Sequence, residues 1–147
     1  MDLLRPPIIT NINTVALAHG EWSLFLDDMR VPPGNPIEWR CEIARSYQEA
    51  INLVSMKRKA PAFVSFDHDL ADELYDPKTW DNASAYKEKT GYDFAMWLVN
   101  KDIDAKGKFL PKGFSYTVHS MNPVGGKNID GLMSSYLRVR ESLDFGA

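Results

Sequence analysis

The chain has 147 residues, of which 44% are apolar and 25% charged, a composition typical of a globular protein that buries its own core. Its formal net charge of −3 argues against a protein that coats long duplex nucleic acid, and leaves open a partner as small as a nucleotide or an RNA end. The single cysteine, Cys41, has no internal disulfide partner, and no apolar run reaches the roughly 18 residues of a membrane span. We therefore expect a cytoplasmic protein without a membrane partner.

Short apolar segments alternate with helical patterns along the chain. Residues 1–22 lack a clear pattern and are expected to form an N-terminal arm or an extra strand. Short buried strands are predicted at residues 23–26, 41–45, 62–66 and 114–118.

Helices are predicted between these strands and after the last one. Ser46 and Glu49 have the spacing of a capping box, and Thr90 or Asp93 could cap a second helix. The clearest helix carries an apolar stripe from Ile129 to Leu137. This alternation predicts a single α/β domain over residues 1–147, with its core at about 23–142. The expected architecture is a three-layer, mostly parallel open sheet of about four to five strands with helices on its faces.

A long polar stretch interrupts this pattern between Ala71 and Lys89. It contains Tyr75, Trp80 and Tyr86 but shows no clear periodicity. Stretches of this kind are usually functional lids or disordered segments, so we predict that it is mobile or lid-like.

Acidic groups and imidazoles follow three of the four predicted strands: Asp27-Asp28, Asp67-His68-Asp69 and His119-Ser120. In an open parallel sheet the carboxyl ends of the strands share one edge, where ligands bind. Carboxylates that meet there repel one another unless a cation lies between them. We therefore predict that Asp27, Asp28 and Asp67 bind Mg²⁺ or Mn²⁺. The alternative is that each aspartate only forms a turn or caps a helix.

The remaining candidates have catalytic or binding chemistry. His119 is the predicted general acid or base, His68 a second proton carrier, and Asp69 either a metal ligand or the residue that orients His119. Arg30 and Arg40, with Trp39, are candidates for substrate binding, although they could equally be ordinary loop residues. A phosphate site is predicted just before the last helix, from Ser120, the amides of Gly125 and Gly126, and Lys127.

The same residues resemble two related groups of proteins. Asp27-Asp28, Asp67 and Ser120 match the acidic pair, the aspartate and the hydroxyl residue of response-regulator receiver domains. The lysine that receivers carry after a fifth strand has no counterpart, because Lys127 lies in a different element. A closer resemblance is to the cyclic-phosphate-processing receiver family, whose signature pieces are similar, in the same order, to segments 24–30, 65–70, 90–93 and 119–123.

This resemblance implies a receiver-like fold that acts on the cyclic phosphate ends of RNA or on cyclic nucleotides. The leading hypothesis is thus a metal-assisted phosphoesterase, since the paired His-x-Thr/Ser motifs of two-histidine phosphoesterases are missing. A second hypothesis is a non-catalytic receiver-like module that binds a nucleotide or a partner. A third is a phospho-accepting signalling receiver.

Overall fold

The computed structural model describes residues 17, 20–34, 40–70 and 89–142, and this part of the chain forms one parallel sheet. The sheet has four strands in the order β2-β1-β3-β4. In register, the last residues of the four strands lie side by side, so the chain leaves every strand at the same edge. The strands are β1 (Ser23–Leu26), β2 (Cys41–Ala44), β3 (Phe63–Phe66) and β4 (Ser115–Val118).

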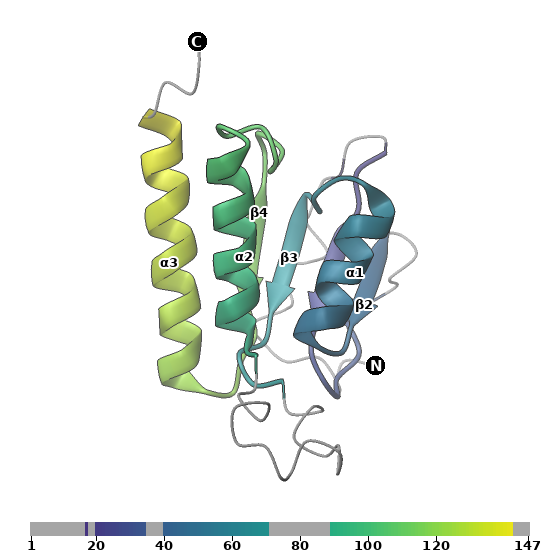
Figure 1. The fold of residues 1–147 in the computed structure, drawn as a ribbon. Coiled ribbons are helices and arrows are strands. Elements are labelled where there is room, and N and C mark those ends of the chain that lie inside the picture. The colour runs from purple at the N-terminus through teal and green to yellow at the C-terminus, as the bar shows by residue number, and fades with distance from the viewer. Residues whose placement is uncertain (1–16, 18–19, 35–39, 71–88, 143–147) are drawn as a thin grey trace, which may run out of the picture.

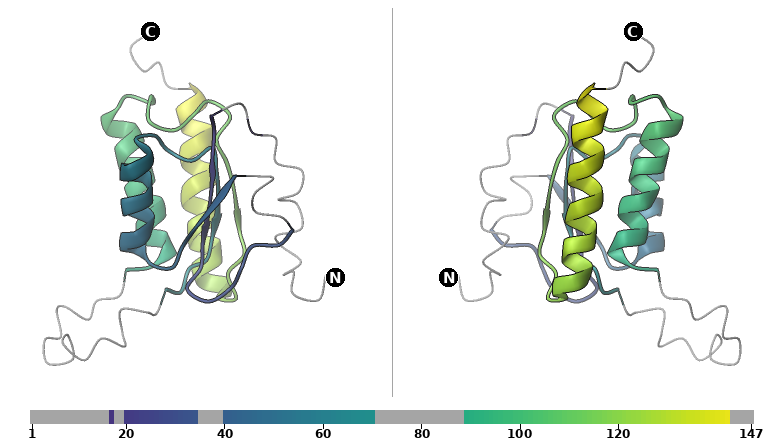
Figure 2. Two further views of the ribbon diagram at one scale, coloured as in Figure 1. Left: turned by 90° about the vertical axis from the view of Figure 1, so that its right-hand side faces the viewer. Right: turned by 90° about the vertical axis from the view of Figure 1, so that its left-hand side faces the viewer.

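All three helices of the described chain contribute to a single core on one face of the sheet. They are α1 (Tyr47–Lys57), α2 (Gly91–Asp104) and α3 (Pro123–Ser142). Alternate strand residues, such as Leu24 and Leu26 in β1, point into this core. Figure 1 shows α1 in front of β2 and α2 in front of β4, and Figure 2 shows α1 and α2 on the same side of the strands.

The receiver-like α/β fold and the parallel sheet are confirmed, with one difference in the layers. The opposite face of the sheet carries a smaller cluster formed by Phe25 and Phe63, and no helix of the described residues packs there. Of the three layers expected, the described chain therefore forms two. The expectations for Trp39, for the N-terminal arm and for the stretch at 71–88 lie outside the described residues.

The predicted caps explain where α1 and α2 begin. The Ser46 hydroxyl accepts a hydrogen bond from the Glu49 amide at 3.1 Å, while the Glu49 carboxylate accepts from the Arg45 amide instead of from Ser46. At α2, Thr90 and Asp93 form a complete capping box. These side chains satisfy amides that the first helical turn leaves without partners.

Helix α3 begins earlier than its sequence suggests. Asn122 caps it, because the Asn122 Oδ1 atom accepts a hydrogen bond from the Gly125 amide at 2.9 Å, and Pro123 takes the first helical position. Gly125 and Gly126 therefore lie inside the helix, and the prediction of a loop at these residues is wrong.

A buried carboxylate joins α2 to α3 at the edge of the sheet opposite the strand ends. Asp102 is fully buried and accepts hydrogen bonds from the amides of Phe109 and Leu110, at 3.0 and 2.8 Å. Its other oxygen lies 2.6 Å from the Tyr136 hydroxyl and 3.1 Å from Arg140 Nε. All its acceptor positions are in use, so Asp102 fixes the helices without leaving a site for a ligand.

Candidate functional site

Asp27, the first residue after β1, lies at the centre of a buried polar cluster. Its Oδ1 atom accepts hydrogen bonds from the amides of Met29 and Arg30, at 2.8 and 2.7 Å. Its Oδ2 atom lies 2.9 Å from His119 Nε2 and 3.2 Å from the Arg30 guanidinium. Burial alone would raise the pKa of Asp27, but the hydrogen bonds from His119 and the two amides outweigh it and lower the pKa to about 2. Asp27 is therefore ionised at neutral pH and accepts about as many bonds as a carboxylate can.

His119 is held on three sides. Its Nε2 atom faces Asp27, and its Nδ1 atom lies 2.7 Å from Ser65 Oγ in β3. The imidazole stacks on the Phe25 ring, with the centroids 4.6 Å apart and an angle of 4° between the planes. Only 1% of the residue is exposed. With both ring nitrogens bonded inside the protein, His119 has little access to a substrate, so the geometry does not favour the predicted role as direct proton carrier.

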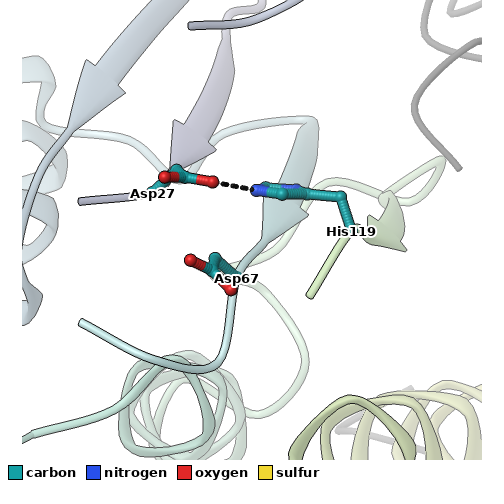
Figure 3. Close-up of side chains that lie close together, drawn as sticks. All are labelled: Asp27, Asp67 and His119. Carbon is teal, nitrogen blue, oxygen red and sulfur yellow. Dashed lines mark hydrogen bonds and ion pairs between the residues drawn. The ribbon is translucent and has the colours of Figure 1, made fainter. Parts of the chain in front are cut away.

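Asp67, the first residue after β3, brings a second carboxylate to the cluster (Figure 3). It is 6% exposed. Burial, and then the negative charge of Asp27, raise the pKa of Asp67 above its usual value, while His119, Arg30 and a hydrogen bond with the Ser120 side chain lower it in part. The two neighbouring carboxyl groups thus differ in their environments. Hydrogen bonds compensate the charge of Asp27, whereas Asp67 is left with repulsion from Asp27 that a cation would relieve.

The donor set of this cluster fits a divalent cation. One atom each of Asp27, Asp67 and His119 lies within 4.8 Å of the others, and two carboxylates with one imidazole suit Mg²⁺ or Mn²⁺. The predicted ligand Asp28 is not a member of this group; it lies half-buried beside it. A cation held by all three residues would displace the Arg30 guanidinium from Asp27 and replace one of the two hydrogen bonds of the His119 ring, to Asp27 or to Ser65. The Arg30 guanidinium also contacts the His119 carbonyl at 3.4 Å.

A second, more exposed cluster lies on the loop after β3. His68 Nδ1 is 2.7 Å from Asp69 Oδ1, and the Asn122 amide group donates to the same Asp69 oxygen at 3.2 Å. The pKa of Asp69 is lowered, mainly by its hydrogen bond with His68. A Cβ atom on Gly125 would lie only 2.3 Å from the His68 ring, so glycine is needed there to let the imidazole lie against α3. Asp69 therefore orients His68 and not His119, and it is not a member of the three-residue group that could hold a cation.

The two predicted substrate arginines lie at opposite edges of the sheet. Arg30 is part of the Asp27 cluster, and about a third of its side chain is exposed. Arg40 precedes β2: its carbonyl accepts a hydrogen bond from the Ser23 amide at 3.0 Å, and its guanidinium donates to the Leu17 carbonyl at 3.1 Å. Because β1 and β2 are parallel, Arg40 lies beside the start of β1, and the structure does not bring it to this site.

The predicted phosphate site is only partly available for an anion. The amide of Gly125 donates to the Asn122 side chain, and the amide of Gly126 donates to the Asn122 carbonyl at 2.8 Å. Both amides therefore have Asn122, the cap of α3, as their partner and are not aimed at a ligand. Ser120 and Lys127 instead line a surface cavity next to the cluster.

Three polar residues of the site were missed in the sequence. Ser65 bonds His119, Asn122 links Asp69 to α3, and Arg45 donates to the Asp27 carbonyl at 3.2 Å and to the Arg30 carbonyl. Ser65 is the one polar residue in the buried strand Phe-Val-Ser-Phe, and a polar side chain in such a strand indicates a buried hydrogen-bond partner. The roles of Asn122 and Arg45 depend on contacts between distant segments.

The fold and the strand-end cluster together define a receiver-like α/β domain. A sequence model of the cyclic-phosphate processing receiver domain matches residues 22–135, which is most of the chain. The chain therefore belongs to this family, whose name joins a receiver fold with the processing of cyclic phosphates. No curated protein and no solved structure showed a significant match. Within the described residues, no helix combines the length and apolar character needed to cross a membrane.

Proposed function

We propose that this protein is a metal-assisted phosphoesterase that acts on cyclic phosphates, either at RNA 2′,3′-cyclic ends or in cyclic nucleotides. The observation that carries the proposal is the convergence of Asp27, Asp67 and His119 at the ends of β1, β3 and β4, with ligand atoms within 4.8 Å of one another. These three residues would hold the cation, in place of the predicted set of Asp27, Asp28 and Asp67. When bound, a divalent cation supplies Lewis-acid polarisation of a phosphoryl group.

The protein's own residues would bind phosphate and move a proton. Arg30 has an exposed part and lies next to Asp27, so its guanidinium is suited to bind phosphate oxygens once a cation replaces it there. His68 is the better proton carrier of the two imidazoles, because Asp69 bonds its Nδ1 atom and about a fifth of its side chain is exposed. An imidazole with one ring nitrogen paired to a carboxylate can act as a general acid or base through the other.

Turnover assays with two histidine variants test this assignment. Wild-type protein with Mn²⁺ should open 2′,3′-cyclic AMP or an RNA end with a 2′,3′-cyclic phosphate. His68→Gln should lower the rate by about 10²- to 10⁴-fold and leave the melting temperature nearly unchanged. Asp69→Asn should lower the rate less, because it disturbs only the orientation of His68. Wild-type activity in His68→Gln would contradict the role of His68.

A non-catalytic module that binds a nucleotide or a partner is the second candidate. It is favoured by the observation that Asp27 and His119 satisfy each other without a ligand. Binding of the same cyclic nucleotides without turnover, under Mg²⁺ or Mn²⁺, would favour this function. The phospho-accepting receiver requires a lysine from a fifth strand, and the described residues contain no such strand.

A further inference from the structure

The outer edge of β4 borders a surface cavity. Receiver-like sheets of the order 2-1-3-4-5 carry a fifth strand on this side. Within the described chain β4 pairs only with β3, so no such strand lies there. The space between β4 and the first turns of α3 is instead a cavity of about 610 Å³. Its polar lining includes Tyr116, Ser120, Asn122, Lys127 and Asp130.

This cavity adjoins both clusters of the candidate site. Ser120 lines it and forms a hydrogen bond with Asp67, and Asn122 lines it and donates to Asp69. A larger groove of about 950 Å³ between α2 and α3 borders neither cluster. Of these two cavities in the described chain, the β4 cavity is therefore the one from which a ligand could reach the reacting groups.

We propose that the β4 cavity binds the nucleoside that carries the cyclic phosphate, with the phosphate toward Ser120 and the base toward Tyr116 and Asp130. This inference rests on the proposed function. The volume of the β4 cavity is within the range of about 300–1,000 Å³ that is usual for small-ligand pockets. The two ends of the cavity differ in charge and hydrogen-bonding groups, and this difference sets the orientation of the ligand.

The end near the cluster suits an anion. Lys127 adds a positive charge there, near the beginning of α3, where the helix dipole also favours negative charge. The Ser120 hydroxyl accepts from the Asn122 amide and bonds Asp67, so its one proton turns to a phosphate oxygen only when a cation compensates Asp67. The far end suits a neutral group with hydrogen-bond donors. Asp130 lies there with its Oδ1 atom 2.6 Å from the Tyr116 hydroxyl, and its carboxylate repels a second phosphate. A base or a ribose hydroxyl can donate to it.

Gly126 provides a clean test, because its hydrogen faces this cavity. A Cβ atom there would lie 3.5 Å from the Val118 side chain and 3.7 Å from that of Ser120, which is ordinary contact. Gly126→Ala should therefore fold, and Gly126→Leu should fill the cavity. Gly131, in the same helix, has nothing within 4 Å of such a Cβ, so Gly131→Ala and Gly131→Leu are matched controls.

Binding of 2′,3′-cyclic AMP is measured by calorimetry in EDTA, and KM is measured separately with Mn²⁺. We expect Gly126→Leu to raise Kd at least about tenfold and Gly126→Ala to raise it less, while the Gly131 variants match wild type. Lys127→Gln should also weaken binding. A parallel titration with a trinucleotide that ends in a 2′,3′-cyclic phosphate distinguishes a free nucleotide from an RNA end.

The outcomes separate this inference from the proposed function. Weaker binding by Gly126→Leu, with wild-type binding by the Gly131 variants, supports the cavity as the binding site even if the protein hydrolyses nothing, in which case only the phosphoesterase proposal fails. Turnover with the same KM in Gly126→Leu and wild type overturns the cavity and leaves the phosphoesterase standing. The cavity proposal is also overturned if wild-type protein binds neither ligand in EDTA or with Mn²⁺.

Discussion

Asp27 and Asp67 lie next to each other, but folding changes their pKa values in opposite directions. His119 and two backbone amides stabilise the Asp27 carboxylate and lower its pKa from 3.8 to about 2. The pKa of Asp67 is raised by burial and by Asp27. Ionised Asp27 therefore favours the folded state, whereas ionised Asp67 opposes it in metal-free protein.

The stability from Asp27 should depend on pH. Because its folded-state pKa is depressed, this contribution is complete above about pH 4 and is lost as the pH falls toward 2. We expect it to amount to about 2 kcal/mol. Urea unfolding of wild type and Asp27→Asn at pH 7, 4 and 2.5 measures it, and the variant should lose less stability on acidification. Equal losses of unfolding free energy in the two proteins would contradict the prediction. Asp67→Asn is the control, and it should be more stable than wild type at pH 7.

His119 should matter for stability as well as for any chemistry. His119→Ala leaves a cavity against Phe25 and removes the hydrogen-bond partner of the buried Asp27 oxygen. We expect the free energy of unfolding to fall by about 2–4 kcal/mol. Thermal and urea unfolding test this, with His68→Gln as a control on the more exposed imidazole. A melting temperature equal to that of wild type would show that His119 is not part of the core.

At the scale of elements, glycine allows α2 to begin directly against the loop after β3. The Gly91 amide donates to the His68 carbonyl at 2.8 Å, and a Cβ atom on Gly91 would lie 1.8 Å from the Asp67 carbonyl oxygen. The start of α2 and the position of Asp67 are therefore coupled through backbone contact.

Gly91→Ala should consequently disturb both the helix and the site. The clash involves backbone and has no flexible side chain to absorb it, so we expect a loss of about 3 kcal/mol in unfolding free energy. Gly113→Ala is the control, because nothing lies within 4 Å of a Cβ there, and it should change stability by less than about 0.5 kcal/mol. Similar melting temperatures for the two variants would contradict the coupling.

At the scale of the whole molecule, a cation that binds only the folded state should stabilise the entire domain. At a hundredfold excess over Kd the gain is about 2.7 kcal/mol. We expect Mg²⁺ or Mn²⁺ to raise the melting temperature, and Asp67→Asn to abolish the rise. Asp28→Asn should preserve it, because Asp28 is outside the three-residue group. A melting temperature that is the same with EDTA and with Mn²⁺ would rule out the metal site.

Local sequence was sufficient to locate most elements of this fold, though not the start of α3. The apolar run at residues 23–26 is followed by two aspartates, and β1 ends at Leu26 as predicted. The capping residue Ser46 located the start of α1, and the stripe that begins at Ile129 located the body of α3, although that helix begins at Pro123. These signals depend on neighbours within a few residues, so they can be recognised without knowledge of the fold.

The sequence also determined that acidic groups gather at one edge of the sheet, because parallel strands share their carboxyl ends. Only the tertiary structure decided which atoms meet. It brings Asp27 and Asp67 together, adds His119 through Ser65 and Phe25, and leaves Asp28 outside. The physical reason is that β1, β3 and β4 join residues that are 40 or more positions apart in sequence. Side-chain direction, burial and hydrogen-bond partners at such a junction are set by packing between strands and not by the local pattern along any one of them.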